Sequence, residues 1–78
     1  MVEHQPDQQR FIIEQDGNTC VLDYVRRGDT VNFTHTYVPF RLRGKGLAEL
    51  LVQEALRWAD DESLRQEASC WYVAKFLK

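Results

Sequence analysis

Residues 41–46 combine side chains and glycines suited to binding an anion. Arg41, Arg43 and Lys45 supply three cations, and Gly44 and Gly46 let a ligand approach the backbone because they carry no Cβ. An apolar helix follows directly, and the unpaired N–H groups of a helix's first turn attract anions. Cations beside such a terminus favour a phosphate site. The alternative is a glycine-containing loop with solvated basic residues, since short glycine motifs occur in many unrelated loops.

The helix that follows the loop has one broad apolar stripe. Its apolar residues recur at helical spacing, which predicts a helix over residues 44–60 that covers a sheet with one face. The stripe consists of Leu47, Ala48, Leu51, Val52, Ala55, Leu56 and Ala59.

Two hairpin signals precede the loop. Residues 11–13 are β-prone, and Asp16-Gly17 is a strong signal for a tight turn. Residues 19–25 then form a second strand, which a turn at residues 27–29 reverses.

A third strand is expected over residues 30–38. Its alternation assigns Val31, Phe33, His35 and Tyr37 to one face. Three consecutive antiparallel strands form a meander with one face that needs cover, which the helix supplies.

Weaker signals lie at the two ends of the chain. Leu64 and Ala68 mark a short fourth strand, which is expected beside the end of the third strand. Residues 71–77 are expected to form a short C-terminal helix that packs onto the sheet. Residues 1–9 are polar and read as a flexible lead-in or partial edge segment. The predicted fold class is α+β: an antiparallel β-meander of three strands plus a short fourth, covered by one main helix and a short C-terminal helix.

Length and composition are those of one soluble domain spanning residues 1–78. Hydrophobic residues make up 44% and charged residues 28%, which is ordinary for a globular protein. A net charge of −2 argues against broad nucleic-acid binding. No apolar run reaches membrane-spanning length and the first residues lack a signal-peptide pattern, so we expect a cytoplasmic protein with free thiols at Cys20 and Cys70. The two cysteines lack zinc-type spacing, and no metal is expected.

The loop and its surroundings resemble a known family. Arg41-x-x-Gly44-x-Gly46, entering a helix straight from a strand, resembles the acyl-CoA pyrophosphate loop of the GNAT superfamily of N-acetyltransferases. The run over residues 35–48 is similar to a branch of short, single-domain GNAT-like proteins. That branch also carries an Arg-Phe near its start, an Asp-Gly hairpin and a Pro-x-Cys-x-Tyr-Val motif. The matching residues here are Arg10-Phe11, Asp16-Gly17 and Cys70-Trp71-Tyr72-Val73, with Ala68 in place of the proline.

The resemblance implies a site for acetyl-CoA. The end of the third strand would line the pantetheine, with the N–H of Val38 polarising the acetyl carbonyl. The backbone from Gly44 onward would hold the phosphates, with Arg41 and Arg43 adding charge. The residues expected to bind acetyl-CoA are Tyr37, Val38, Arg41, Leu42, Arg43, Gly44, Lys45, Gly46, Leu47 and Ala48.

Three residues are candidates for catalysis. Cys70 is either an acyl-accepting nucleophile, if its pKa is lowered, or a packing residue. Tyr72 is either a general acid toward the CoA thiolate, as tyrosines are in many GNAT enzymes, or an aromatic that packs against the helix. His35 is either a general base toward an amine or a hydrogen-bonded, semi-buried side chain.

Two functions from different classes follow. The first is an acetyl-CoA-dependent N-acetyltransferase acting on an unidentified amine or protein acceptor, as a monomer or weak dimer. The second is a non-catalytic CoA- or acyl-CoA-binding regulatory module, because the elements expected from the sequence do not include the helices and terminal hairpin that usually build the acceptor site. A third ligand class, another phosphate compound, also suits the three cations.

Overall fold

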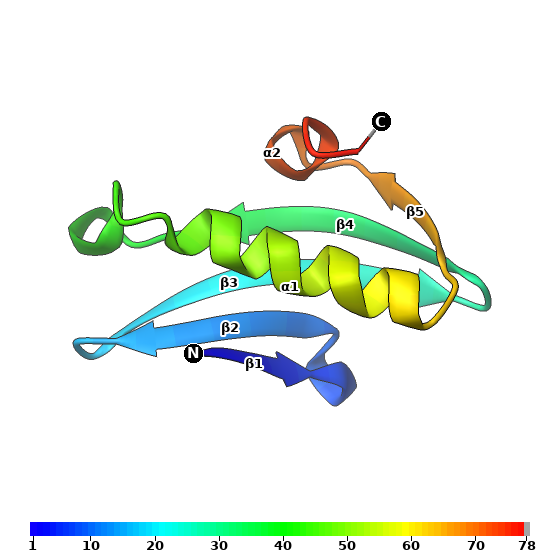
Figure 1. The fold of residues 1–78 in the computed structure, drawn as a ribbon. Coiled ribbons are helices and arrows are strands. Elements are labelled where there is room, and N and C mark those ends of the chain that lie inside the picture. Colours follow the sequence, from blue (N-terminus) through cyan, green and yellow to red (C-terminus); the bar gives the residue numbers. More distant parts are fainter. Residues whose placement is uncertain (78) are drawn as a thin grey trace.

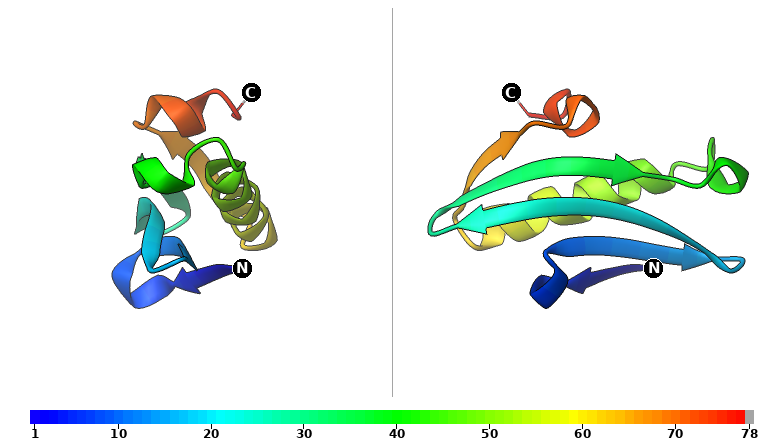
Figure 2. Two further views of the ribbon diagram at one scale, coloured as in Figure 1. Left: turned by 90° about the vertical axis from the view of Figure 1, so that its left-hand side faces the viewer. Right: turned by 180° about the vertical axis from the view of Figure 1, so that it is seen from behind.

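A five-stranded sheet and one long helix form two layers, with α1 lying across one face of the sheet (Figures 1 and 2). The computed structural model describes residues 1–77. The strands are β1 (Val2–Gln5), β2 (Arg10–Gln15), β3 (Asn18–Arg27), β4 (Thr30–Tyr37) and β5 (Arg65–Ala68). The helices are the 3-10 turns η1 (Pro6–Gln8) and η2 (Phe40–Leu42), the long α1 (Leu47–Asp61) and the short α2 (Trp71–Ala74). The predicted α+β class is confirmed.

The strands lie in chain order from β1 to β5, and all neighbours except β4 and β5 are antiparallel. The predicted tight hairpin joins β2 to β3, with Asp16 and Gly17 both at positive φ. Because α1 runs back along the sheet between β4 and β5, β5 enters the sheet parallel to β4 and beside its first half, Thr30 to Phe33. The expectation that this strand lies beside the end of the third strand was therefore wrong.

Two predicted boundaries also shift. The segment read as a lead-in contains β1, which adds an edge strand paired with β2. The helix begins at Leu47 rather than at residue 44, because Gly44 and Gly46 have φ of 82° and 76°, outside the helical region. Gly46 is thus the N-cap of α1, and the loop remains free of regular structure up to that point.

The core lies between α1 and the sheet. Five residues of the predicted stripe are buried, namely Leu47, Leu51, Val52, Ala55 and Ala59. They pack against side chains from the strands, η2 and the C-terminal segment: Phe11, Ile13, Cys20, Leu22, Tyr24, Val31, Phe33, Leu42, Leu64 and Val73. Cys20, in the middle of β3, is fully buried in this core.

A β-bulge in β4 reverses the predicted faces of its second half. Phe33 pairs with Tyr24 but His35 pairs with Asp23, so Thr34 is an extra residue. One extra residue exchanges the two faces of everything beyond it. Val31 and Phe33 point to the core as predicted, whereas His35 and Tyr37 are exposed and Thr36 pairs with the buried Leu22. The assignment of all four to one face was wrong, and Thr36 takes the inner position instead.

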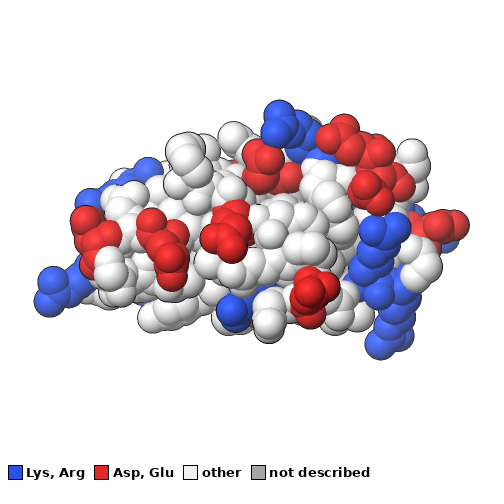
Figure 3. Space-filling view, turned by 90° about the horizontal axis from the view of Figure 1, so that it is seen from below, with Lys and Arg blue, Asp and Glu red and all other residues white. Residues whose placement is uncertain are grey.

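Charges of both signs are scattered over the surface seen from below in Figure 3. Acidic and basic side chains alternate there with uncharged ones, and among the residues drawn no broad basic patch gathers on that face. Within residues 1–77, no helix is long and apolar enough to cross a membrane.

Candidate functional site

A cleft opens where β4 and β5 part. The two strands pair as far as Phe33 and Ala68, and the carbonyl of Phe33 accepts the N–H groups of both Ser69 and Cys70 at 3.1 Å. Beyond this point β4 continues to Tyr37, while the segment that follows β5 turns away into α2 (Figure 1). From Phe33 onward, β4 therefore diverges from the segment that leads into α2, and we call this divergence the fork.

The fork encloses a cavity of about 610 Å³. Its lining comes from β4 and the residue after it, from the loop of residues 41–46, which we call the glycine loop, from the first turn of α1 and from the start of α2. The lining residues are 36–38, 42–44, 46–49 and 70–72. The cavity thus joins the first turn of α1 at one end to the side chains of Cys70 and Tyr72 at the other.

The glycine loop is held back onto the end of β4. The Nε of Arg43 donates to the carbonyl of Val38 at 2.9 Å, which fixes the guanidinium at the rim of the cleft. Gly44 and Gly46 take left-handed φ values, which side chains with a Cβ rarely adopt. The first bond of α1 runs from the N–H of Leu50 to the carbonyl of Gly46, so the preceding amides of the first turn are left without a helical acceptor. This end of the cleft attracts an anion.

A carboxylate already lies near those amides. Glu49, in the first turn of α1, places its Oε1 3.6 Å from the position that a Cβ on Gly46 would occupy. An acidic side chain at this position interacts favourably with the helix dipole. It also opposes any anion that enters the same end of the cleft.

The thiol of Cys70 faces β4 across the cleft. Its sulfur lies 3.6 Å from the hydroxyl oxygen of Thr36. Partial burial acts to raise the pKa of Cys70, but hydrogen bonding by the backbone of Val73, the Thr36 hydroxyl and the backbone of Tyr72 and Thr36 outweighs it and lowers that pKa. Cys70 is the N-cap of α2, so its sulfur lies beside the unpaired N–H groups at the start of that helix. A thiol with a lowered pKa is a better nucleophile at neutral pH.

Tyr72 keeps its proton more firmly than an ordinary tyrosine. Burial raises the pKa of its hydroxyl, and the carboxylate of Glu49 raises it further. The Nζ of Lys75 lies 4.7 Å from the centre of the Tyr72 ring and 5.3 Å from that of Trp71. Trp71, with 74% of its surface exposed, forms the outer lip of the cleft on the α2 side.

Most of the predicted site residues come together in this cleft. Of the ten residues expected to bind acetyl-CoA, eight line it: Tyr37, Val38, Leu42, Arg43, Gly44, Gly46, Leu47 and Ala48. Cys70 and Tyr72, two of the three candidates for catalysis, line it as well.

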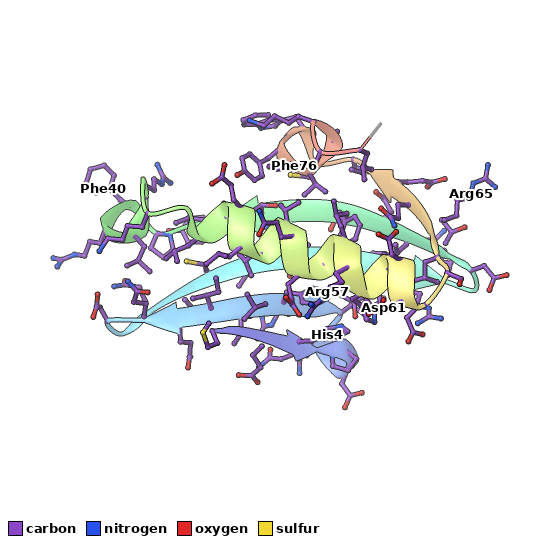
Figure 4. The ribbon with its side chains drawn as sticks, in the orientation of Figure 1. His4, Phe40, Arg57, Asp61, Arg65 and Phe76 are labelled. Atoms are coloured by element: carbon purple, nitrogen blue, oxygen red, sulfur yellow. The ribbon has the colours of Figure 1, made fainter. Side chains whose placement is uncertain are left out.

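Three predicted residues lie elsewhere. Lys45 is exposed and absent from the lining, and Arg41 lines a separate hollow beside Asp16 and the exposed Phe40, which projects from the end of the molecule in Figure 4. His35 lies on the opposite face of the sheet, where its Nδ1 is 3.3 Å from the Oδ2 of Asp23. The structure therefore separates His35 from the cleft.

Three lining residues were missed by sequence reasoning. Thr36 was assigned to the other face because the bulge left no clear signal in the sequence. Glu49 lies outside the apolar stripe, although an acidic residue three positions after Gly46 is a signal for the first helical turn. Trp71 was quoted only as part of the C-terminal motif. No group of histidine, cysteine or acidic residues suited to a metal ion occurs among residues 1–77.

Comparison with known proteins decides the family. The profile described as "GCN5-related N-acetyl-transferase" matches residues 10–78. The chain belongs to this family. Its resemblance to GNAT proteins is confirmed, and the α+β arrangement described above is a GNAT-like fold.

Vertebrate members of the family align with almost the whole chain. The protein named "Protein NATD1" from Bos taurus is 38% identical over 80 residues, which cover 99% of this chain and 71% of that protein. The human protein of the same name is 35% identical, again with 99% and 71% coverage. The zebrafish protein is 33% identical, with 99% and 73% coverage. GNAT family membership supports N-acetyl transfer as the class of reaction and an acyl-CoA thioester as co-substrate.

Proposed function

We propose that this protein is an acetyl-CoA-dependent N-acetyltransferase and that acetyl-CoA binds in the cleft between β4 and α2. The observation that carries the proposal is the joining of two features in one cavity. The first turn of α1, with free amides and Arg43 beside it, lies at one end, and a thiol of lowered pKa lies at the other. A nucleotide thioester has its phosphates and its reactive carbonyl at opposite ends in the same way.

The phosphates would bind at the glycine loop. The backbone N–H groups from Gly44 to Ala48 and the guanidinium of Arg43 are the donors we assign to them. Glu49 must turn away from the first turn to make room. The pantetheine would then run along residues 36–38 into the fork.

The acetyl group would lie near Cys70, where direct transfer to an amine is possible. The amine nitrogen attacks the carbonyl carbon while the N–H of Val38 donates to the carbonyl oxygen. The carbon–sulfur bond breaks, and the departing CoA sulfur takes the hydroxyl proton of Tyr72. The amine releases its extra proton to water, from which Tyr72 is reprotonated. The raised pKa keeps the Tyr72 hydroxyl protonated at neutral pH, which a proton donor requires.

A two-step route uses Cys70. Its thiolate attacks the acetyl carbonyl, CoA leaves as the thiol after taking the Tyr72 proton, and an acetyl thioester remains on Cys70. The amine then attacks the thioester carbonyl, the bond to the Cys70 sulfur breaks to regenerate the thiolate, and the proton lost by the amine returns through water to the Tyr72 oxygen. An acetyl adduct that hydroxylamine releases, absent in Cys70→Ala and present in Cys20→Ala, is expected if this route operates. Turnover without such an adduct would indicate direct transfer.

A second function, a non-catalytic acetyl-CoA-binding module, is favoured by one observation. His35, the residue expected from the sequence to act as general base, faces away from the cleft. Turnover separates the two functions: labelled acetyl-CoA incubated with amines, peptides and protein lysates should yield an acetylated product for the enzyme and none for the binding module.

Binding itself is tested by calorimetry with acetyl-CoA. Arg43→Ala should weaken binding by about 1–3 kcal/mol, the cost of a charge-assisted hydrogen bond left unmade. The matched control is Arg41→Ala, two residues earlier in the same loop but outside the cleft. Equal losses in the two variants would indicate general electrostatic attraction, and an absence of binding to the wild-type protein would overturn the proposal.

A further inference from the structure

A pair of hydrogen bonds closes the fork just before Cys70. The Oδ1 of Asn32 accepts the backbone N–H of Ser69 at 2.9 Å, and the Nδ2 of Asn32 donates to the Ser69 hydroxyl at 2.9 Å. The carbonyl of Phe33 accepts the Ser69 and Cys70 N–H groups at 3.1 Å. Ser69 is therefore held by both a side chain and the backbone of β4.

Asn32 offers Ser69 the groups of a peptide unit. A carboxamide carries a carbonyl acceptor and N–H donors, as the backbone of a neighbouring strand does. The Asn32 side chain therefore supplies hydrogen-bond partners to the segment that leaves β5. The regular pairing of β4 with β5 ends at Phe33 and Ala68, directly before Ser69. The side chain of Asn32 thus ends the β4–β5 ladder at a fixed point and fixes where the chain departs.

Cys70 is the residue most affected by this point. Its backbone N–H donates to the carbonyl of Phe33 and its sulfur is 3.6 Å from the Thr36 hydroxyl, so two of its contacts are with β4. A movement of Ser69 away from β4 would carry the sulfur away from that hydroxyl. Asn32 itself lies on the outer face of the sheet and contributes nothing to the core.

We propose that Asn32 is a positioning residue that sets the place of the Cys70 sulfur in the cleft by holding Ser69 against β4. The inference rests on the proposed function, because it assigns the cleft to the acyl group. It adds a residue outside the cleft that tunes the reactive end without touching the ligand.

The test is the rate of Cys70 alkylation by iodoacetamide across a range of pH, measured on the folded protein by intact mass. Cys20 is fully buried, so it does not compete. Asn32→Ala should slow alkylation at neutral pH about three- to ten-fold and raise the midpoint of the pH profile, since a hydrogen bond is worth roughly that factor. A loss of global stability alone would instead speed alkylation and add a label at Cys20, which becomes accessible only when the protein unfolds. Asn32→Ala with the wild-type rate and midpoint would overturn the proposal.

Two variants sharpen the assignment. Ser69→Ala loses only the hydroxyl bond, so it should slow alkylation less than Asn32→Ala, by about two- to three-fold. Adding it to Asn32→Ala should have no further effect, because both act through one contact. Additive losses would overturn the proposal. Gln9→Ala is the matched control: it removes another side-chain amide that accepts a backbone N–H, from Arg26 at 2.7 Å on the β2 side of β3, and should leave Cys70 unchanged.

The outcomes remain separable from the proposed function. If Asn32→Ala does not fold, Ser69→Ala alone decides, and an unchanged alkylation profile in it overturns the inference. Calorimetry of the wild-type protein with acetyl-CoA is run in parallel. Loss of binding there overturns the proposed function, whereas an unchanged Cys70 profile in the presence of normal wild-type binding overturns only the role of Asn32.

Discussion

The hydroxyl oxygen of Thr36 and the sulfur of Cys70 lie 3.6 Å apart and join β4 to α2 after the strands have separated. The contact exists because the bulge at Thr34 turns Thr36 inward. Without that extra residue, Thr36 would face the opposite side of the sheet and His35 would face the cleft. One inserted residue therefore decides which side chain meets the thiol.

Replacing Thr36 by valine keeps its shape and removes this donor. We expect Thr36→Val to raise the pKa of Cys70 and to slow its alkylation at neutral pH about three-fold, the effect of one weak hydrogen bond. Thr34→Val is the matched control, since the Thr34 hydroxyl donates to the Asp23 carbonyl at 3.3 Å and not to the thiol. An equal change in both variants would show that the hydroxyl of Thr36 has no specific effect.

A substitution at Gly44 should weaken ligand binding through backbone strain rather than through a steric clash. At Gly44 no atom lies within 4 Å of an added Cβ, but φ is +82°, which costs a residue with a Cβ about 1–2 kcal/mol. Gly44→Ala should therefore reshape the loop and weaken acetyl-CoA binding in calorimetry. Gly28→Ala carries a similar strain at φ +57° in the β3–β4 turn, so it should lower thermal stability without changing affinity. Weakened binding in both would attribute the effect to stability.

Glu49 should oppose the binding of a phosphate ligand. Glu49→Gln removes a negative charge beside the first turn of α1, so acetyl-CoA should bind about two- to ten-fold more tightly at low salt, with the gain shrinking as salt is added. The same change should bring the pKa of Tyr72 down toward its ordinary value, although burial still raises it. Glu54→Gln, on the same helix but paired with Arg57 at 3.0 Å, is the control. Unchanged affinity in Glu49→Gln would contradict the assignment of this end to phosphates.

The local signals in the sequence predicted most of the elements. Asp16-Gly17 fixed the β2–β3 hairpin and the apolar stripe of α1 fixed its buried face, because both depend on nearest neighbours and helical spacing. The loop at Gly44 and Gly46 was found because glycines beside a helix start are a local pattern as well. Eight of the ten residues expected to bind acetyl-CoA line one cleft for this reason.

The pairing of strands that lie far apart along the chain could not be predicted from local sequence signals. The bulge depends on how β3 and β4 align, so the face of His35 and Thr36 could not be read from alternation alone. The parallel placement of β5 depends on the path of α1. Likewise, the polar segment around His4 showed no reason to form a strand until its pairing with β2 and its aromatic contacts were known.

His4 belongs to an aromatic cluster far from the cleft. Its ring stacks on Phe11 with centroids 4.0 Å apart, meets Trp58 of α1 edge-on at 4.9 Å, and is hydrogen-bonded to the Tyr24 hydroxyl at 2.7 Å. Figure 4 shows His4 beneath the C-terminal half of α1. The cluster thus joins β1, at the edge of the sheet, to the helix.

Protonation of His4 should loosen this connection. Burial lowers the pKa of His4 below its ordinary value of 6.5, and the nearby Glu62 carboxylate only partly offsets the effect. Below about pH 6.5 the unfolded chain therefore binds more protons at this residue than the folded chain, so stability falls as pH decreases, by at most about 1.4 kcal/mol per pH unit. His4→Phe keeps a stacked ring but cannot titrate, and its melting temperature should fall less than that of the wild-type protein between pH 6.5 and 5.5. His35 is present in both proteins and cancels in the comparison. Equal falls in the melting temperature of the two proteins over this pH range would mean that His4 is equally easy to protonate in the folded and unfolded states.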